Sequence, residues 1–141
     1  MGIVMKPPAW ARPFVLSEHE FDVDGQIYKF WVLKKELAIE LRNFVGFPEG
    51  FLFISEEVPT EFREFMLRHE VREVVNRAGQ EGRCLATLRQ ELDEVPLDMC
   101  IDYIRFRREL FRSLVMYYAC QGGYEELKRE LAGSLDYLET L

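Results

Sequence analysis

The stretch from residue 51 to residue 79 constrains the fold of this chain more than any other part of the sequence. An apolar run at 51–55 is followed by Pro59 and Thr60, and then by a helical pattern that reaches Gly79. Thr60 is expected to cap the helix, because a threonine oxygen can accept a hydrogen bond from the N–H groups of the first turn. Gly79 is expected to end it, because glycine readily takes the left-handed conformation found just after helices. The stretch therefore predicts a short strand, a turn and one long helix.

This helix contains the sequence H-E-V-R-E from His69 to Glu73, and His69 is one of only two histidines in the chain. Side chains four residues apart lie one above the other on a helix, so His69 and Glu73 are predicted to share a face. An imidazole and a carboxylate placed in this way can bind one zinc ion. Glu70 directly follows the histidine, where it is placed to act as a general base on a metal-bound water. The candidate site thus consists of His69 and Glu73 as metal ligands and Glu70 as the catalytic base.

The pattern resembles the zinc-peptidase helix H-E-x-x-H, with Glu73 in place of the second histidine. In zincin-type metallopeptidases a strand lies beside the active helix and can receive an extended substrate along its edge. The resemblance covers residues 51–79 and implies zinc as the cofactor and hydrolysis as the reaction. A catalytic zinc ion usually takes three protein ligands and a water, so a third ligand must come from elsewhere in the chain. The sequence leaves three residues open for that position: Cys84, Glu91 and His19.

A structural pair is the alternative explanation of the same residues, and the sequence favours it. Charged residues make up 30% of the chain, so H-E-x-x-E arises easily by chance. A histidine at the edge of an apolar stripe is usually hydrogen-bonded to a carboxylate, and Glu73 could serve as that partner without any metal. On this interpretation the two side chains stabilise the fold and take no part in chemistry.

Composition narrows the class of protein. A hydrophobic content of 48% and an aromatic content of 13% are those of a globular protein. The formal net charge of −7 argues against general binding to DNA or RNA, because phosphate contacts need a basic face. A local basic stretch is interrupted by Glu109, and a helix would spread it over two sides as a solvated face. Its members are Arg105, Arg107, Arg108 and Arg112.

Cysteine usage and the N-terminal sequence predict a cytosolic protein. The three cysteines have no regular spacing and include no C-x-x-C pair, which is typical of reduced thiols. They are Cys84, Cys100 and Cys120. Residues 1–13 contain three prolines and no apolar core of the kind found in signal peptides, and no run approaches the length of a membrane span. We expect residues 1–13 to lie extended over the surface.

The N-terminal part predicts a small antiparallel sheet. Residues 20–23 and 26–33 flank Asp24-Gly25, and this dipeptide is the strongest short signal for a hairpin. The predicted strand at 51–55 can pair with that hairpin. The segment 34–45 fits a helix that stops at Gly46, although its apolar residues also alternate as in a strand.

The rest of the chain reads as helices. Apolar residues recur at helical spacing over 83–93, 97–121 and 124–138, with Pro96 at the start of the longest helix and Gly122-Gly123 at its end. A leucine row on the last helix is expected to pack on its own domain. With about four helices after the sheet, the sequence predicts one globular α+β domain over 1–141.

Three functions are open on the sequence alone. The leading one is a non-catalytic interaction or structural protein that self-associates through its aromatic hairpin or its C-terminal helix. The second is the zincin-like metal-binding protein or hydrolase that uses His69, Glu70 and Glu73. The third is a small-molecule binding domain with a pocket between the sheet and the central helix.

Overall fold

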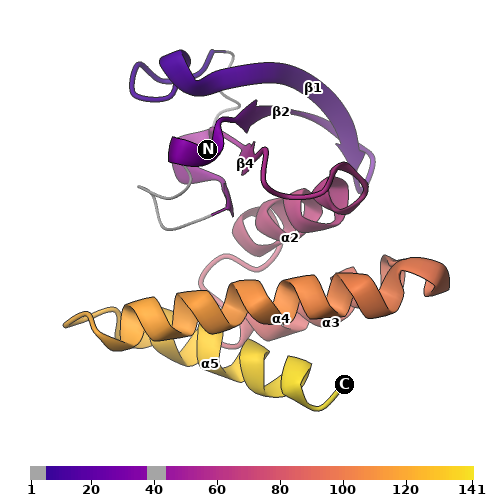
Figure 1. Ribbon diagram of the computed structural model, residues 1–141, viewed down its shortest axis with the longest axis vertical. Helices are drawn as coiled ribbons and strands as arrows, with labels where there is room; N and C mark the ends of the chain where they lie inside the picture. Colours follow the sequence, from indigo (N-terminus) through magenta and orange to yellow (C-terminus); the bar gives the residue numbers. More distant parts are fainter. Residues whose placement is uncertain (1–5, 38–43) are drawn as a thin grey trace. The chain divides into compact units, whose positions relative to one another are not determined.

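The computed structural model describes residues 6–37 and 44–141. The chain divides into two compact units, an N-terminal unit of residues 1–74 and a C-terminal unit of residues 75–141. Within its described residues, the N-terminal unit contains a four-stranded sheet and one long helix, and the C-terminal unit contains three helices (Figure 1). The predicted α+β class is therefore confirmed, whereas the expectation of one domain over the whole chain stays a prediction.

The predicted hairpin is present and begins earlier than expected. Strand β1 (Val15–Val23) pairs antiparallel with strand β2 (Gln26–Leu33) around Asp24 and Gly25. Both turn residues have positive φ, 52° and 88°, as a two-residue hairpin turn requires. The Oδ1 atom of Asp22 accepts a hydrogen bond from the Gly25 amide at 3.1 Å, which adds a side-chain contact to the turn.

The sheet is mixed, not antiparallel throughout. Strand β4 (Phe53–Ser55) pairs parallel with β2, and the short strand β3 (Val45–Gly46) pairs antiparallel with β4. The strand order is β1-β2-β4-β3. The chain from the end of β2 to the start of β4 is long enough to return to the same end of the sheet, which a parallel pair requires. A hairpin signal in the sequence gives no information about the direction of a strand that arrives later.

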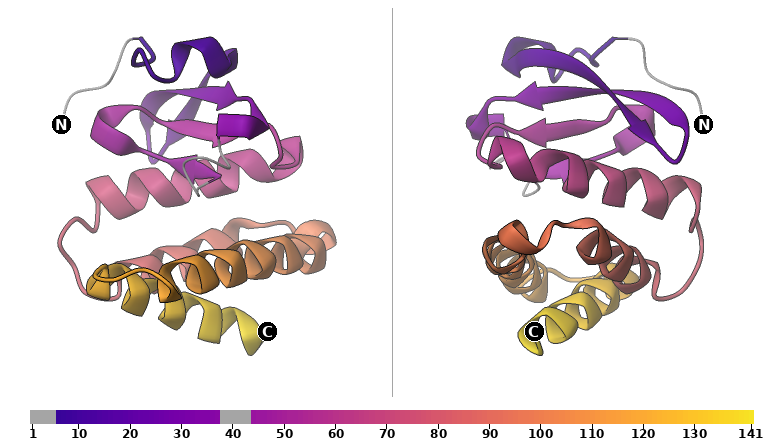
Figure 2. Two further views of the ribbon diagram at one scale, coloured as in Figure 1. Left: turned by 60° about the vertical axis from the view of Figure 1, so that its left-hand side comes forward. Right: turned by 90° about the vertical axis from the view of Figure 1, so that its right-hand side faces the viewer.

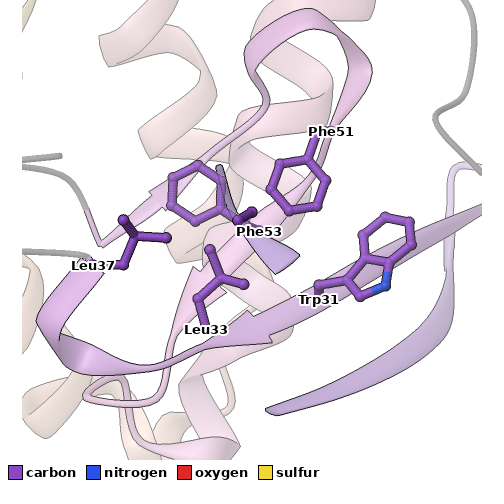
Figure 3. Packing of buried hydrophobic residues seen from close by; sticks show 6 residues of the cluster. Trp31, Leu33, Leu37, Phe51 and Phe53 are labelled. Atoms are coloured by element: carbon purple, nitrogen blue, oxygen red, sulfur yellow. The ribbon is translucent and has the colours of Figure 1, made fainter. Parts of the chain in front are cut away.

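One face of this sheet carries an apolar cluster (Figure 3). Trp31 and Leu33 of β2 pack there with Phe51 and Phe53, and Leu37 closes one side. The rings of Phe51 and Phe53 are stacked with centroids 5.9 Å apart. The indole N–H of Trp31 donates to Glu18 at 3.1 Å, so its polar atom is satisfied. The cluster also includes Ala11, with Phe14 and Val15 at its edge.

Two N-terminal expectations need correction. Residues 8–14 form tight turns and the 3₁₀ helix η1 (Arg12–Phe14), not an extended segment, because the amides of Ala11 and Arg12 donate to the Pro8 carbonyl. These turns direct Ala11, which is fully buried, into the apolar cluster. Half of the helix predicted over 34–45, residues 38–43, lies outside the described residues. Residues 35–37 are helical, whereas Val45 belongs to strand β3.

The central helix is shorter than predicted at both ends. A 3₁₀ turn η3 (Thr60–Phe62) precedes α2 (Arg63–Val75), and Thr60 makes no side-chain cap. Residues 76–79 continue as turns, so Gly79 lies four residues beyond the helix end. Helix α2 is fastened to the β1–β2 hairpin by Arg72, whose guanidinium donates to both Asp24 carboxylate oxygens, at 2.9 and 3.1 Å. Figure 2 shows α2 lying along one face of the sheet.

The C-terminal unit consists of three helices that match the predicted ones within two residues at each end. They are α3 (Arg83–Glu94), α4 (Leu97–Ala119) and α5 (Glu125–Glu139). The leucine row of α5 packs within its own unit, as predicted, since Leu131 and Leu138 join Leu88 and Phe111 in one buried cluster. In the described part of the chain, no helix combines the length and the apolar character that crossing a membrane requires.

Two glycines give opposite predictions for the same substitution. A Cβ atom at Gly25 or at Gly133 would meet no heavy atom within 4 Å, so neither change creates a clash. Gly25→Ala should cost about 1 kcal/mol of unfolding free energy, because its φ of 88° is unfavourable for alanine. Gly133→Ala, within α5, should instead stabilise by about 0.5–1 kcal/mol. Urea unfolding of both variants measures the two effects, and equal signs would contradict the backbone assignment at one of the positions.

Candidate functional site

His69 and Glu73 lie on one face of α2, as the sequence predicts. The Nε2 atom of His69 is 2.8 Å from a carboxylate oxygen of Glu73. The His69 side chain is buried, with 3% exposed, and Glu73 is partly exposed at 21%. Nε2 carries the proton and the carboxylate oxygen accepts it, whether the imidazole is neutral or charged. A histidine in this arrangement is oriented by its carboxylate neighbour.

This contact limits how the pair could hold a metal ion. A nitrogen that donates its proton to Glu73 cannot use the same lone pair to bind zinc. Coordination through Nε2 would therefore break the hydrogen bond and release a proton, which makes such binding dependent on pH. The pair offers two ligand atoms of types that zinc accepts. In the described part of residues 1–74, no third histidine, cysteine or carboxylate joins them.

The other predicted residues of the N-terminal unit are not gathered at this pair. His19 lies on β1, where its Nε2 atom is 2.7 Å from the Ser17 hydroxyl and its ring stacks on Phe30 with centroids 5.0 Å apart. Glu70 is half-buried and follows His69 by one residue, which places it about 100° further around the helix. Its role as a general base stays a prediction.

Cys84 belongs to the C-terminal unit and lies in the first turn of α3. Its buried Sγ atom accepts a hydrogen bond from the Ser134 hydroxyl at 3.1 Å. Its backbone amide and that of Gly82 donate to the two carboxylate oxygens of Glu130, at 3.1 and 3.0 Å. Glu130 of α5 therefore accepts hydrogen bonds from backbone N–H groups at the start of α3. Those groups have no partner within the helix and attract negative charge. Within its own unit, Cys84 is a packed and hydrogen-bonded thiol, and its role as a metal ligand stays a prediction.

Glu91 has a structural environment that argues against a ligand role. Both of its carboxylate oxygens accept hydrogen bonds from the Arg107 guanidinium, at 2.8 and 3.0 Å, and the Tyr103 hydroxyl also donates to it. All three side chains are buried. The Arg107 guanidinium also lies over the ring of Phe111, 5.0 Å from its centroid. A metal ion could take Glu91 only by leaving Arg107 as a buried, unpaired charge.

The pKa shifts of this buried triad agree with its geometry. Burial raises the pKa of Tyr103 well above its ordinary value, and the negative charge of Glu91 raises it further against the opposing effect of Arg107. Burial is the largest single effect on Arg107 and lowers its pKa, but the charge of Glu91, the electrostatic effect of Tyr103 and the hydrogen bonds to Glu91 together outweigh it and raise the pKa. Tyr103 thus stays protonated and donates, and Arg107 stays charged.

Sequence analysis missed this triad. The sequence predicts Arg107 on a solvated helix face, and this is wrong, because Arg107 is buried. The available signal was its spacing among the apolar residues of α4, since an arginine inside such a row needs a buried acidic partner. The partner comes from a different helix, so spacing within α4 could not identify it.

Comparison with known proteins finds no match to this chain among protein-family models, curated proteins or solved structures.

The triad predicts a large and asymmetric effect of mutation. Arg107→Met should destabilise the protein by about 3–5 kcal/mol, because it leaves Glu91 charged and buried without its partner. The double variant Glu91→Leu/Arg107→Met should cost less than Arg107→Met alone, since it removes both charges. Chemical unfolding followed by circular dichroism measures these values. Arg129→Met is the matched control: Arg129 is an exposed cation on α5 of the same unit, so a change within about 0.5 kcal/mol is expected. A double variant as unstable as the single one would contradict the charge argument.

Proposed function

We propose that this protein acts by association and not by catalysis, as an interaction protein that forms a homodimer through helix α4. The observation that supports this proposal is the exposure of two large apolar side chains on adjacent turns of α4. Leu97 is 93% exposed and Ile101 is 73% exposed. Single exposed apolar residues are common on protein surfaces, but neighbouring ones on a rigid helix form a patch that favours contact.

The patch lies on a part of α4 that α5 does not cover. The C-terminal end of α5 reaches Arg108 and Arg112 of α4: Arg108 donates to the Leu138 and Leu141 carbonyls, and Arg112 forms two hydrogen bonds with Glu139. Residues 97–107 of α4 extend beyond these contacts (Figure 1). The antiparallel packing of α5 against α4 thus does not extend to the apolar patch. A second helix could pack there beside α5.

The charges beside the patch favour a second copy of the chain as the occupant. Asp98 and Arg105 are seven residues apart, so they lie on the same side of the helix and flank Ile101. In an antiparallel pair of α4 helices related by a twofold axis near Ile101, Asp98 of each copy would lie opposite Arg105 of the other. A twofold interface is self-complementary in this way, because each contact between residues i and j occurs twice. The exposed side chain of Arg105 lies 3.8 Å from the Asp102 carboxylate, which is a long distance for an ion pair.

A different partner would need a positive side chain opposite Asp98 and a negative one opposite Arg105 by coincidence. A second copy of the chain supplies both, because a twofold axis places Arg105 opposite Asp98 and Asp98 opposite Arg105. The expected dimer therefore has Ile101 beside its twofold axis, two Asp98–Arg105 ion pairs on either side of it, and Leu97 next to each ion pair. Exposed ion pairs contribute only about 0.2–1 kcal/mol each, so the apolar contact should supply most of the affinity and the charges should fix the register.

The proposal is tested by sedimentation equilibrium on the full chain. Ile101→Lys should convert a dimer to a monomer, because it places two like charges on the twofold axis. Asp98→Arg and Arg105→Asp should each weaken the dimer, since each variant brings like charges together. The double variant Asp98→Arg/Arg105→Asp should restore dimerisation, because the pairs are recreated with reversed sign.

Met116→Lys serves as the control for this experiment. Met116 is on the same helix and is 72% exposed, but it lies outside the proposed contact. This variant should dimerise like the unmodified protein. A monomeric unmodified protein would refute the proposed function, and failure of the charge-swapped double variant to recover would refute the antiparallel register. Circular dichroism verifies that every variant keeps its helix content.

We also infer a second candidate function, zinc binding, from the contact between His69 and Glu73. Two ligand types acceptable to zinc meet on one buried helix face, and the zincin-like interpretation would add Glu70 as general base in a hydrolytic reaction. The competing explanation is a hydrogen-bonded structural pair. The two explanations differ in what the loss of His69 should change.

Elemental analysis of protein purified without a histidine tag distinguishes the two explanations, with His69→Ala measured alongside. Zinc binding predicts about one zinc per chain, lost in the variant and released from the unmodified protein as pH falls and the imidazole is protonated. A structural pair predicts no zinc in either protein, and a loss of about 1–3 kcal/mol in unfolding free energy for His69→Ala. Glu64→Gln, an exposed change on the same helix, should alter neither quantity.

A further inference from the structure

The N-terminal unit contains a cavity between two tight turns that none of the preceding analysis uses. Its volume is about 450 Å³, within the range that small ligands occupy. Residues from 6–12 line one side and residues from 48–51 line the other. Those residues are Lys6, Pro7, Pro8, Trp10, Arg12, Pro48, Glu49 and Phe51.

Backbone hydrogen bonds shape both walls. On one side the Ala11 amide donates to the Pro8 carbonyl at 3.0 Å, and on the other the Phe51 amide donates to the Pro48 carbonyl at 2.9 Å. The second turn has Glu49 with φ 51° and Gly50 with φ 85°, two successive left-handed residues. Left-handed backbone at a residue other than glycine is unfavourable, and such conformations gather at ligand sites. The strained turn brings Glu49 and Phe51 to the cavity.

The floor of the cavity is aromatic and rigid. The Trp10 ring meets Phe51 edge-on, with centroids 5.6 Å apart and an interplanar angle of 87°. Phe51 is buried and held by Phe53 and Trp31 behind it (Figure 3), whereas Trp10 remains 45% exposed. The indole of Trp10, placed edge-on against a buried ring, offers its exposed apolar face to a ligand at little cost in conformational entropy.

The charges around this floor favour an anion. Lys6 and Arg12 contribute two positive charges to the lining, and Glu49 contributes one negative charge. The Nε atom of Arg12 donates to the Pro7 carbonyl at 2.9 Å, which holds the guanidinium at the cavity wall. The cavity lining is positive, although the chain as a whole has a net charge of −7. A positive lining favours negatively charged ligands over neutral ones.

We propose that this cavity binds a small anionic aromatic molecule. The aromatic part of the ligand stacks on the exposed Trp10 ring, and its carboxylate meets Arg12 and Lys6. An arginine guanidinium suits a planar carboxylate because its N–H groups match the two oxygens. This assignment is independent of the proposed dimer, since all of its residues lie in the N-terminal unit.

The test uses 2-naphthoate and its neutral analogue 2-naphthamide, titrated into the full chain labelled with ¹⁵N. Two indole N–H signals are expected, from Trp10 and Trp31. Naphthoate should shift the Trp10 signal most, with a saturable one-to-one curve, and should bind more tightly than naphthamide. Lys6→Gln and Arg12→Gln should each weaken naphthoate about threefold and leave naphthamide nearly unchanged. Trp10→Ala should weaken both compounds.

Lys35→Gln provides the matched control, because Lys35 is an exposed cation of the same unit outside the cavity lining. It should leave the affinity for naphthoate unchanged. Arg12→Lys keeps the charge but loses the planar donor set, so its naphthoate affinity should fall between those of the unmodified protein and Arg12→Gln. Equal affinities for acid and amide, or equal effects of Lys35→Gln and Arg12→Gln, would overturn the anion assignment. Absence of any saturable shift of Trp10 would overturn the site itself.

Discussion

Several carboxylates of this protein are buried or half-buried, and each needs a hydrogen-bonding or charged partner. The packing of the helices depends on those pairs. Glu91 is fully buried and lies in a bidentate contact with Arg107, while Glu73 meets the imidazole of His69. Asp24 receives both hydrogen bonds of Arg72, which fastens α2 to the hairpin. A buried ionised carboxylate without such a partner is costly, so each pair fixes the position of the elements that supply it. Of the carboxylates that suggest metal ligands in the sequence, Glu91 is therefore the one engaged on both oxygens by a buried arginine.

Helix α4 has a buried side that serves the fold and an exposed side on which the proposed dimer contact depends. Its inward side carries Tyr103, Arg107 and Phe111, which hold the C-terminal unit together. Its outward side carries Leu97 and Ile101 where the cover of α5 ends, with Asp98 and Arg105 beside them. Two arginines of the basic stretch of α4 are neutralised within the chain, Arg107 by Glu91 and Arg112 by Glu139 and Glu109. Arg108 donates hydrogen bonds to backbone carbonyls at the end of α5. The exposed surface near the start of α4 therefore consists of an apolar patch with one negative side chain, Asp98, and one positive side chain, Arg105, beside it.

The elements that the sequence predicted well are those defined by local pattern. Asp24-Gly25 fixed the hairpin, because both positions need a backbone that few other residue pairs accept. Pro96 and the two glycines at 122 and 123 marked the ends of α4 within two residues. Local pattern failed where a distant segment decides the outcome. Strand β4 runs parallel to β2 although nothing within 51–55 encodes a direction, and residues 8–14 turn because Ala11 enters the core.

The sequence by itself determined the α+β class, the hairpin, the three C-terminal helices and the shared helix face of His69 and Glu73. These follow from spacing along the chain, which repeats every two residues in a strand and about every 3.6 residues in a helix. Only the tertiary structure decided that Glu91 pairs with Arg107, that Leu97 and Ile101 stay exposed, and that two distant turns enclose a cavity at Trp10. Those outcomes depend on which side chain of another element fills the space beside a residue, and spacing within one element carries no information about that neighbour.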